Sequence, residues 1–183
     1  IAGPGFINFR LTQGVMASVV TAIRAQQGRF GEGPRSGRRV QVEFVSANPV
    51  GPMHVGHGRW AALGDSIARI LEHAGDEVQR EFYINDAGVQ MDIFAASVSA
   101  RYLELCGREV DFPEDGYRGA YITEIAREIL AEEADSWVDA APEVREAHFR
   151  EKAYAQVLEH LKGVLHGMGV DFDVWFSERT LHA

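Results

Sequence analysis

The stretch from Val42 to Leu71, VEFVSANPVGPMHVGHGRWAALGDSIARIL, limits the possible folds more than any other part of the chain. It begins as a run rich in β-branched residues, passes through a loop with two prolines, and continues with apolar residues at helical spacing. With its surroundings it predicts a strand at Val40 to Val45, a helix at His57 to Ala74 that Gly75 ends, and a second strand at Glu77 to Ile84. This order predicts a βαβ unit with parallel strands and a right-handed crossover.

The remainder of the chain is predicted to be mainly helical. One more strand, Gly5 to Leu11, is expected near the start, followed by a helix that Thr12 caps and that ends near Gly28. After Asn85, apolar residues recur at spacings of three and four over three long segments, before strand character returns. These segments predict helices at Val89 to Leu105, Tyr117 to Ala134 and Pro142 to Gly167, and a strand at Phe172 to Phe176. A long helical excursion between two strands indicates an insertion into an α/β domain.

Size and cysteine content exclude several classes of protein. With 183 residues, 46% of them hydrophobic, the chain can bury the core of one domain, and its single cysteine, Cys106, excludes a disulfide framework. No apolar run approaches the roughly 20 residues that span a bilayer, and the first residues lack the layout of a signal peptide. We therefore expect a cytoplasmic protein and, because the chain starts at Ile1 rather than Met, a piece of a longer one.

Charge is unevenly distributed along the chain. The formal net charge of −9 argues against strong binding of a polyanion by this chain as a whole. From Arg24 to Arg39, however, there are five arginines and one acid, Glu32. This stretch overlaps the segment Gly28 to Gly37, which has the composition of a linker. The arginines fit either a solvated linker or contacts with a phosphate backbone.

Two histidines stand where the helix of the βαβ unit should begin. In such a unit the loop after the first strand lies at the carboxyl end of the sheet, where unpaired N–H groups of the helix attract anions. Nothing here matches the glycine pattern of dinucleotide sites or the Walker lysine loop. His54 and His57 can instead donate hydrogen bonds to one phosphate group, and Gly56 leaves room for a flat base or a close phosphate.

The same spacing allows two other interpretations. Histidines three residues apart can bind a metal ion, but two ligands are too few for a zinc site, and HVGH lacks the glutamate of the H-E-x-x-H motif. The imidazoles can also simply cap the helix or pack against it. Spacing alone leaves phosphate binding, metal binding and capping open.

Four segments of the chain resemble arginyl-tRNA synthetases. VEFVSANPVGPMHVGH is similar to their signature region, with HVGH as their form of the class I HIGH motif, and REFYINDAGVQMD to the segment that follows it in bacterial-type members. AGPGFINFRL is similar to the end of their N-terminal extra domain, and FDVWFSERTLH to the strand that re-enters the catalytic domain. The resemblance covers essentially the whole chain, and EFVSANP and YINDAG make it more specific than HxGH alone.

The resemblance implies a fold and its division into segments. The expected class is α/β, a partial Rossmann-like (HUP-type) parallel nucleotide-binding fold with a mainly helical insertion. Residues 1–37 would be the tail of the N-terminal extra domain plus a linker, and residues 38–88 the first half of the catalytic nucleotide-binding fold with the HIGH motif. Residues 89–170 would be the helical insertion, and residues 171–183 a strand returning toward the catalytic core.

The resemblance also implies an activity. The chain would be a fragment of an enzyme that activates L-arginine with ATP and Mg²⁺ to arginyl-adenylate and transfers it to tRNA(Arg). His54 and His57 would hold the ATP phosphates and the charge on the α-phosphate, with Gly56 under the adenine. Glu43 and Asn48 match the family's arginine-binding positions, and Ser46 would line the pocket beside them.

The residue types bear on these implied roles only in part. A carboxylate such as Glu43 inside a strand buried on both faces needs a cation such as guanidinium, whereas on an edge strand it needs none. Asn48 is held extended by the proline after it and can accept from an α-amino group, although Asn-Pro is also a common turn. Asn85 and Asp86 reach the same rim, either as ligand contacts or as a turn in which Asp86 caps the next helix.

The chain also departs from the family pattern. It lacks the KMSKS motif, whose lysine neutralises pyrophosphate: Lys152 and Lys162 lie in a predicted helix, and the loop before HVGH has Val50, Gly51 and Pro52 rather than a lysine. We therefore expect KMSKS further along the parent chain, and expect this piece alone to be inactive and prone to self-association through an open sheet edge. Another HIGH-bearing nucleotidyltransferase and a non-catalytic truncated module are the alternatives.

Overall fold

The computed structural model describes residue 3 and residues 5–182. The elements in chain order are α1 Gln13–Gln26, η1 Gln27–Arg29, β1 Arg39–Glu43, α2 Val55–His73, β2 Glu77–Ile84, α3 Val89–Leu105, α4 Ala120–Glu133, α5 Pro142–Gly167, β3 Val174–Ser177 and η2 Glu178–Leu181, where η marks a short 3₁₀ helix. Within the described residues, no helix is both long and apolar enough to cross a membrane.

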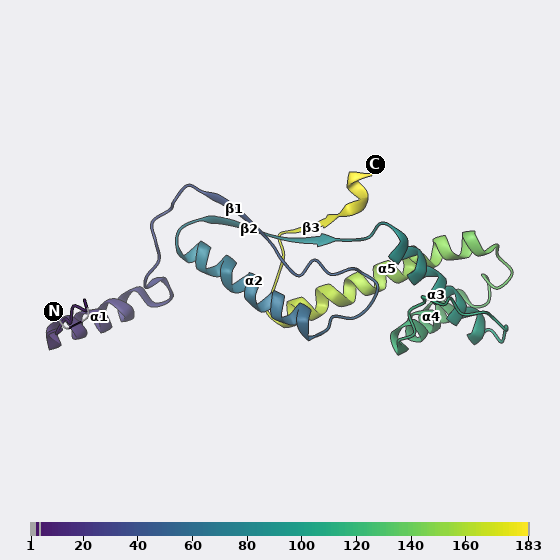
Figure 1. Ribbon diagram of the computed structural model, residues 1–183, viewed down its shortest axis with the longest axis horizontal. Coiled ribbons are helices and arrows are strands. Elements are labelled where there is room, and N and C mark those ends of the chain that lie inside the picture. The colour runs from purple at the N-terminus through teal and green to yellow at the C-terminus, as the bar shows by residue number, and fades with distance from the viewer. Residues whose placement is uncertain (1–2, 4, 183) are drawn as a thin grey trace.

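The three strands form one parallel sheet in the order β1-β2-β3. β2 lies in the middle, paired with β1 along its first part and with β3 along its second. Figure 1 shows α2 and α5 together below the strands, and Ala61 of α2 and Leu165 of α5 share one buried cluster with Phe82 of β2. The predicted parallel α/β fold is therefore confirmed, with β1 as an edge strand of the described sheet.

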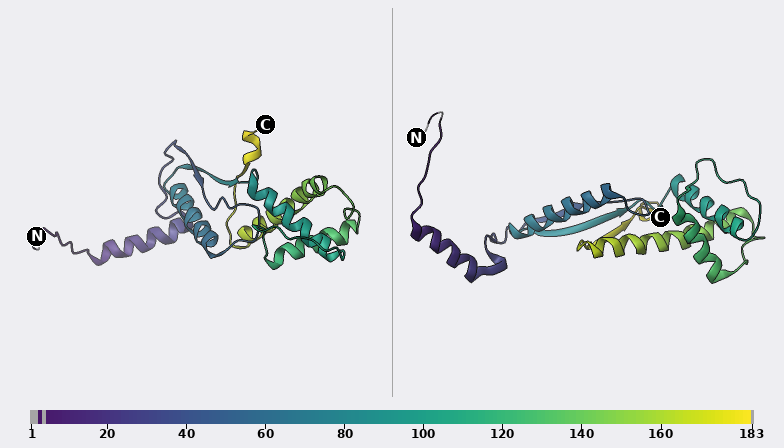
Figure 2. Two further views of the ribbon diagram at one scale, coloured as in Figure 1. Left: turned by 45° about the vertical axis from the view of Figure 1, so that its right-hand side comes forward. Right: turned by 90° about the horizontal axis from the view of Figure 1, so that it is seen from below.

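A second and larger core lies within the helical segment. Apolar side chains of α3, α4 and α5 are fully buried against one another, among them Met91, Phe94, Val98, Tyr102, Ile122, Ile129, Phe149 and Leu161. The rings of Tyr102 and Phe149 meet edge to face with centroids 4.8 Å apart, a favourable arrangement. Figure 2 shows α3, α4 and the first part of α5 grouped at one end of the molecule, where they form a bundle with its own core.

The start of the chain projects from both cores. Figures 1 and 2 show α1 extending away from the rest of the molecule, and none of its residues is buried. Thr12 caps the helix as predicted, accepting at its hydroxyl from the N–H of Val15 (3.4 Å). The predicted strand at Gly5 to Leu11 is wrong: the segment forms no strand, because side chains such as Phe9, 82% exposed, have no sheet beside them to join.

The arginine-rich linker is ordered against the far end of α2. The N–H of Gly33 donates to the carbonyl of His73, and Arg38 forms an ion pair of 2.6 Å with the buried carboxylate of Asp76. Gly75, at φ 102°, ends the helix as predicted and leaves room for the linker backbone to pass. Arg38 therefore holds the linker to the fold.

The element bounds follow the sequence closely from β2 onward. β2, α3 and α5 begin and end at the predicted residues. α4 starts at Ala120 rather than Tyr117, because the N–H of Tyr117 donates to the hydroxyl of Ser97 (2.9 Å) and the chain there remains a loop. β3 starts at Val174 rather than Phe172, whose ring packs on Phe44 with centroids 4.5 Å apart.

Candidate active site

The loop between β1 and α2 carries the predicted site residues at the carboxyl end of the sheet. β1 ends at Glu43, and α2 begins at Val55 with His54 as its N-cap. Nδ1 of His54 accepts from the N–H of Gly56 (3.1 Å), and Nδ1 of His57 accepts from the N–H of His54 (3.3 Å). The two imidazoles therefore form a reciprocal capping box at the start of the helix.

These two hydrogen bonds fix the tautomer of both rings. A neutral imidazole whose Nδ1 accepts a hydrogen bond carries its proton on Nε2. The rings of His54 and His57 stack with centroids 3.8 Å apart, so their two N–H groups are close together. Among the described residues, no atom accepts from either Nε2. The first turn of α2 thus combines capping with two adjacent donors at the positive end of the helix dipole.

The surroundings of His57 favour its neutral form. Partial burial, followed by the electrostatic effect of His54, lowers the pKa of His57 below its usual value. The indole of Trp60, one turn further along α2, also lies against this imidazole, with centroids 5.6 Å apart. At neutral pH His57 is therefore an uncharged hydrogen-bond donor.

Gly56 is required by the histidine cap itself. A Cβ at this position would lie 2.8 Å from Cε1 and 3.0 Å from Nδ1 of His54, closer than side-chain atoms can pack. Any side chain would push the His54 ring away from the backbone N–H that it caps. The sequence predicts room for a nucleotide at this glycine, whereas the structure shows a different reason for it, the contact with the His54 ring.

A hollow of about 560 Å³ opens beside His57. Its walls come from the loop after β1, from Trp60 of α2, and from Tyr117 and Tyr121. The phenol of Tyr121 donates to the carbonyl of Val50 (2.9 Å) and so holds the loop against the helical segment. No motif marks these three aromatic residues in the sequence, because only the tertiary fold brings them to the loop.

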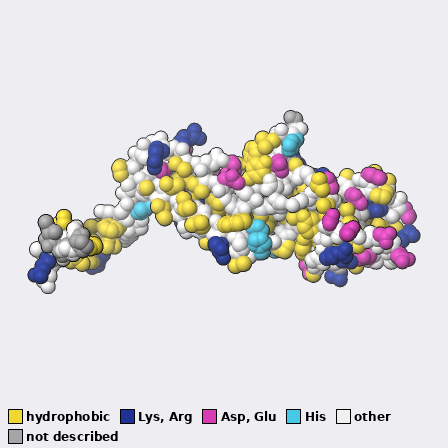
Figure 3. Space-filling view, viewed as in Figure 1, with side chains coloured by type: hydrophobic (Ala, Val, Ile, Leu, Met, Phe, Trp, Pro, Cys, Tyr) yellow, Lys and Arg dark blue, Asp and Glu magenta, His cyan; other side chains and the backbone are white. Residues whose placement is uncertain are grey.

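The acidic side chains are concentrated away from the histidines. Figure 3 shows a group of histidine side chains near the middle of one face and others at its left and upper right, whereas most acidic side chains on that face lie over the helical segment at its right, away from the middle group. The net charge of −9 is therefore a poor guide to the potential at the start of α2. An anion can approach this part of the surface.

The loop is strained where it leaves β1. Val45 and Ser46 have φ values of 67° and 43°, a left-handed conformation that a β-branched residue rarely adopts. Such strain costs on the order of 1–3 kcal/mol per residue and persists mainly at ligand sites. The turn brings the hydroxyl of Ser46 to Oε1 of Glu43, to which it donates (2.6 Å), and to the N–H of Tyr83, from which it accepts (3.2 Å).

Glu43 does not lie in a strand buried on both faces. It is exposed at the end of β1, so the burial argument for a guanidinium partner is wrong. The reason is that β1 has a neighbouring strand on one side only within the described residues. Oε1 of Glu43 is bonded to Ser46, and Oε2 has no partner in the described part of the chain, which leaves it available to a cation.

Asn48 is the centre of a chain of three amides. Its Oδ1 accepts from Nδ2 of Asn85 (2.8 Å), and its Nδ2 donates to Oε1 of Gln90 at the start of α3. Asn85 therefore lies at the rim of the site through its contact with Asn48. The sequence did not single out Gln90, since nothing in its local pattern shows that α3 begins beside this loop.

Asp86 is not the cap of α3. The N-cap is Gly88, at φ 82° and without a side-chain hydrogen bond, so that expectation is wrong. The carboxylate of Asp86 is buried and accepts instead from the hydroxyl of Ser177 (2.6 Å) and the N–H of Arg179 (3.3 Å). Asp86 therefore ties the chain after β3 to the end of β2.

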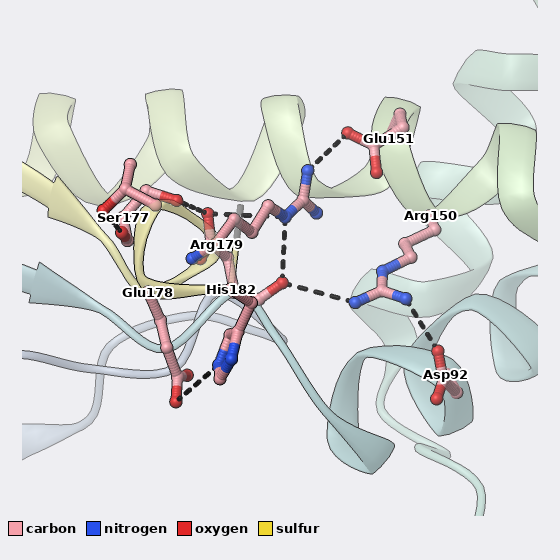
Figure 4. Close-up of polar contacts among 9 residues, drawn as sticks. Asp92, Arg150, Glu151, Ser177, Glu178, Arg179 and His182 are labelled. Atoms are coloured by element: carbon pink, nitrogen blue, oxygen red, sulfur yellow. Dashed lines mark hydrogen bonds and ion pairs between the residues drawn. The ribbon is translucent and has the colours of Figure 1, made fainter.

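The backbone carbonyl of Asp86 accepts hydrogen bonds from two guanidinium groups. It accepts from Nε of Arg179 (3.0 Å) and from Nη2 of Arg150 (3.3 Å). Figure 4 shows both arginines reaching toward this point, with Glu151 and Asp92 as their outer partners at 2.8 Å each. The segment after β2 is thus held by hydrogen bonds from both α5 and η2.

The metal interpretation of HVGH finds no third ligand. Across the described residues, no group of three or more His, Cys, Asp or Glu side chains is placed to hold a metal ion. Nδ1 of each histidine is already bonded to the backbone. Within the described residues, the two histidines alone are too few ligands for a zinc site.

Comparisons with known proteins cover the whole chain. The model of a family described as class I tRNA synthetases (R), catalytic domain, matches residues 19–179. The arginine–tRNA ligases of Heliobacterium modesticaldum and Carboxydothermus hydrogenoformans are 47% and 49% identical to the chain over all of its length. The chain spans about a third of each relative, 32% and 33%.

Solved structures give the same result. A putative arginyl-tRNA synthetase from Campylobacter jejuni has a TM-score of 0.84 at 27% identity, covering 94% of this chain and 38% of that one. The arginyl-tRNA synthetase of Thermus thermophilus has a TM-score of 0.56 at 29% identity, covering 93% and 28%. Another HIGH-bearing nucleotidyltransferase would not explain a match that includes the helical segment. The chain therefore belongs to the catalytic-domain family of class I tRNA synthetases (R).

Proposed function

We propose that the full-length protein containing this chain is an arginine–tRNA ligase, which activates L-arginine with ATP and transfers the arginyl group to tRNA(Arg). One observation carries the proposal: two imidazole N–H donors start α2 at the carboxyl end of a parallel sheet, beside a hollow of about 560 Å³. The identity of the amino acid is supported by the relatives, which are named arginine–tRNA ligase.

The proposed chemistry is attack of the arginine carboxylate on the α-phosphorus of ATP, with pyrophosphate leaving. Negative charge then develops on the α-phosphate oxygens, which preorganised donors stabilise. His54 and His57 would donate from Nε2 to these oxygens, aided by the positive end of α2, and Gly56 would lie under the adenine. Because capping already fixes both rings, little side-chain freedom is lost when the nucleotide binds.

Arginine is proposed to bind at the loop after β1. Glu43 would pair with the guanidinium through the carboxylate oxygen that Ser46 does not use, and Asn48 would accept from the α-amino group. Ser46 would line the site and keep the Glu43 carboxylate in one orientation. An uncharged amino acid would leave Glu43 without its partner and is expected to bind more weakly.

Mg²⁺ is proposed to enter with ATP, held by phosphate oxygens and water. The described residues fit this arrangement, since the start of α2 offers donors for phosphate and no carboxylate cluster for a protein-held ion. The ion would neutralise charge on the phosphates.

The remaining parts of the reaction are proposed to come from the rest of the full-length protein. Lys152 and Lys162 lie within α5 and are paired with acids at 2.8 and 2.9 Å, so neither offers a cation to pyrophosphate. A KMSKS motif and most of the tRNA contacts would therefore lie outside this chain. We propose the cytoplasm as the compartment, and keep the segments 1–37, 38–88, 89–170 and 171–183 as the proposed domain division.

The isolated chain is proposed to self-associate. β1 has an open edge within the described residues, and the neighbouring face of α2 exposes large apolar side chains, Trp60, Leu63, Ile67 and Ile70. Open strand edges and apolar patches of this kind favour association.

The test is amino-acid-dependent ATP–pyrophosphate exchange. The full-length protein should catalyse exchange with L-arginine, and not with lysine or the uncharged analogue citrulline. The isolated chain should catalyse none. Exchange that depends on a different amino acid, or on none, would contradict the proposal.

A further inference from the structure

We infer that Asn85 and Gln90 are positioning residues that couple the direction of the Asn48 side-chain amide to their own, and that this shared direction decides whether Asn48 offers a carbonyl or an NH₂ group to the α-ammonium group of the amino acid. The inference rests on the proposed function of Asn48 and extends it to two residues that do not line the hollow.

The three amides come from three different segments. Asn48 lies in the loop after β1, Asn85 directly follows β2, and Gln90 is in the first turn of α3. Asn48 accepts from Asn85 at Oδ1 and donates to Gln90 from Nδ2. Each end of the Asn48 amide therefore keeps one further hydrogen-bonding position for a ligand.

The three amides alone do not determine which way their donor and acceptor ends point. Rotating a side-chain amide by 180° exchanges its donor and acceptor ends, so all three can reverse together without losing a hydrogen bond. The outer atoms, Oδ1 of Asn85 and Nε2 of Gln90, have no hydrogen-bond partner in the part of the chain that the structure describes. A group of fixed polarity at either end would therefore select one direction.

The direction matters because an ammonium group only donates. In the observed direction, an α-ammonium group that approaches Asn48 on the side of Asn85 meets a carbonyl oxygen. In the reversed direction it meets an NH₂ group, which cannot accept. Selecting the direction therefore selects between an attractive contact and a repulsive one.

The backbone beside Asn85 is held in place by several hydrogen bonds. Its neighbour Asp86 is 1% exposed and is held at its carboxylate by Ser177 and Arg179, and at its carbonyl by Arg179 and Arg150 (Figure 4). The position of Asn85 is thus fixed, whereas the direction of its amide is coupled to that of Asn48.

Two isosteric substitutions test the inference in the full-length protein. Gln90→Glu and Asn85→Asp add the same negative charge at opposite ends of the chain of amides. A carboxylate can only accept. At position 90 it accepts from the NH₂ group of Asn48, as Gln90 does, and preserves the observed direction. At position 85 it requires the NH₂ group of Asn48 on the opposite side and so reverses the direction. The measurements are KM for arginine, KM for ATP and kcat in ATP–pyrophosphate exchange.

Gln90→Glu should leave KM for arginine within about twofold of the wild type or lower it, because the contact is kept. Asn85→Asp should raise it about tenfold or more, the scale of a lost hydrogen bond to a charged group. KM for ATP should stay unchanged in both. Equal shifts of KM for arginine in the two variants, in either direction, would show that added charge alone acts and would overturn the inference.

Asn48→Ala separates this inference from the proposed function. If it leaves KM for arginine unchanged, Asn48 is not a ligand, and the proposed role and the inference both fail. If it raises KM while the two isosteric variants behave alike, only the inference fails. Should Asn85→Asp not fold, Gln90→Lys replaces it, because a lysine at position 90 only donates and so reverses the direction of the amides. The KM of this variant for arginine should rise, and the rise should persist at high salt, which screens the charge of the lysine.

Discussion

The helical part and the α/β part of this chain differ in how they use their side chains. In the helices α3 to α5, apolar residues such as Phe149 are fully buried and Glu133 is paired with Lys152, although Arg101, Arg150 and Gln156 each keep one buried polar atom without a partner among the described residues. In the α/β part, α2 leaves Leu63 59% exposed, and the N–H donors of His54 and His57 have no acceptor among the described residues. Satisfied contacts stabilise a fold, whereas unsatisfied ones are available to ligands.

Backbone strain follows the same division only in part, because Ala134, the C-cap of α4 in the helical part, also has a positive φ of 51°. Val45 and Ser46, two non-glycine residues with positive φ, lie in the loop of the α/β part, beside the hollow. We therefore expect substitutions in the helical part to change mainly the free energy of unfolding, and substitutions at the start of α2 to change mainly activity.

The largest expected effect is on stability. Phe149→Ala should lower the free energy of unfolding by about 3–5 kcal/mol, because it removes a fully buried ring from the helical core. Urea unfolding of the purified protein measures this. Val144→Ala on the same helix, where the side chain is 57% exposed, should stay within about 0.5 kcal/mol. Equal losses in both variants would show that the helical core does not carry the stability.

The next effect is on activity. His57→Ala in the full-length protein should slow arginine-dependent ATP–pyrophosphate exchange by about 10²-fold, the scale for losing one preorganised donor to developing charge. KM for arginine should change little. His160→Ala, an exposed histidine on α5, is the matched control and should retain wild-type exchange. Wild-type exchange in His57→Ala would refute the phosphate role.

The third effect concerns acid stability in the helical part. Burial alone would raise the pKa of Glu133, but hydrogen bonds from Lys152, Trp137 and His148 outweigh it and lower this pKa to about 2. A lowered pKa contributes stability that is present above the usual value of 4.5 and is lost as pH falls toward 2. Glu133→Gln should therefore cost on the order of 2 kcal/mol at pH 7 and flatten the decline in unfolding free energy below pH 4.5.

A matched variant checks the source of that effect. Glu128→Gln removes an exposed carboxylate from the same helix and should leave the pH profile of unfolding unchanged. Identical profiles for the two variants would attribute the acid sensitivity to net charge rather than to the Glu133 contacts.

The smallest effect compares two glycines of α2. Gly56→Ala should reduce exchange about tenfold, because its Cβ would displace the capping ring of His54. Gly58→Ala meets only the end of Met168, at 3.8 Å, and should be tolerated or slightly stabilising. Equal activity in the two variants would mean that the His54 ring need not be held by the backbone.

Much of the fold could be predicted because it rests on local periodicity. The strand Glu77–Ile84 and the helices Val89–Leu105 and Pro142–Gly167 have the expected bounds, since their apolar spacing and their turn residues agree. The segment Gly5 to Leu11 has strand composition but no neighbouring strand, and composition cannot supply one.

The candidate site was predicted less completely, because tertiary contacts decide it. The position of His54 and His57 at a helix start follows from the sequence, but their reciprocal cap through Nδ1 does not. The exposure of Glu43 depends on which strand flanks β1, and the role of Asp86 depends on Ser177, which lies 91 residues away. Such contacts leave no local pattern.

The reciprocal cap of His54 and His57 has a consequence for acid conditions. A ring protonated on both nitrogens cannot accept the backbone N–H that it caps, so a solvent proton and the helix compete for the same lone pair. Burial and the electrostatic effect of His54 lower the pKa of His57, so the stability that its neutral form contributes is present above the usual histidine value of 6.5 and is lost as pH falls below it. Acidification should therefore loosen this turn first, and the earliest sign would be faster hydrogen exchange at the amide of His54, which His57 caps, while the rest of the protein stays protected.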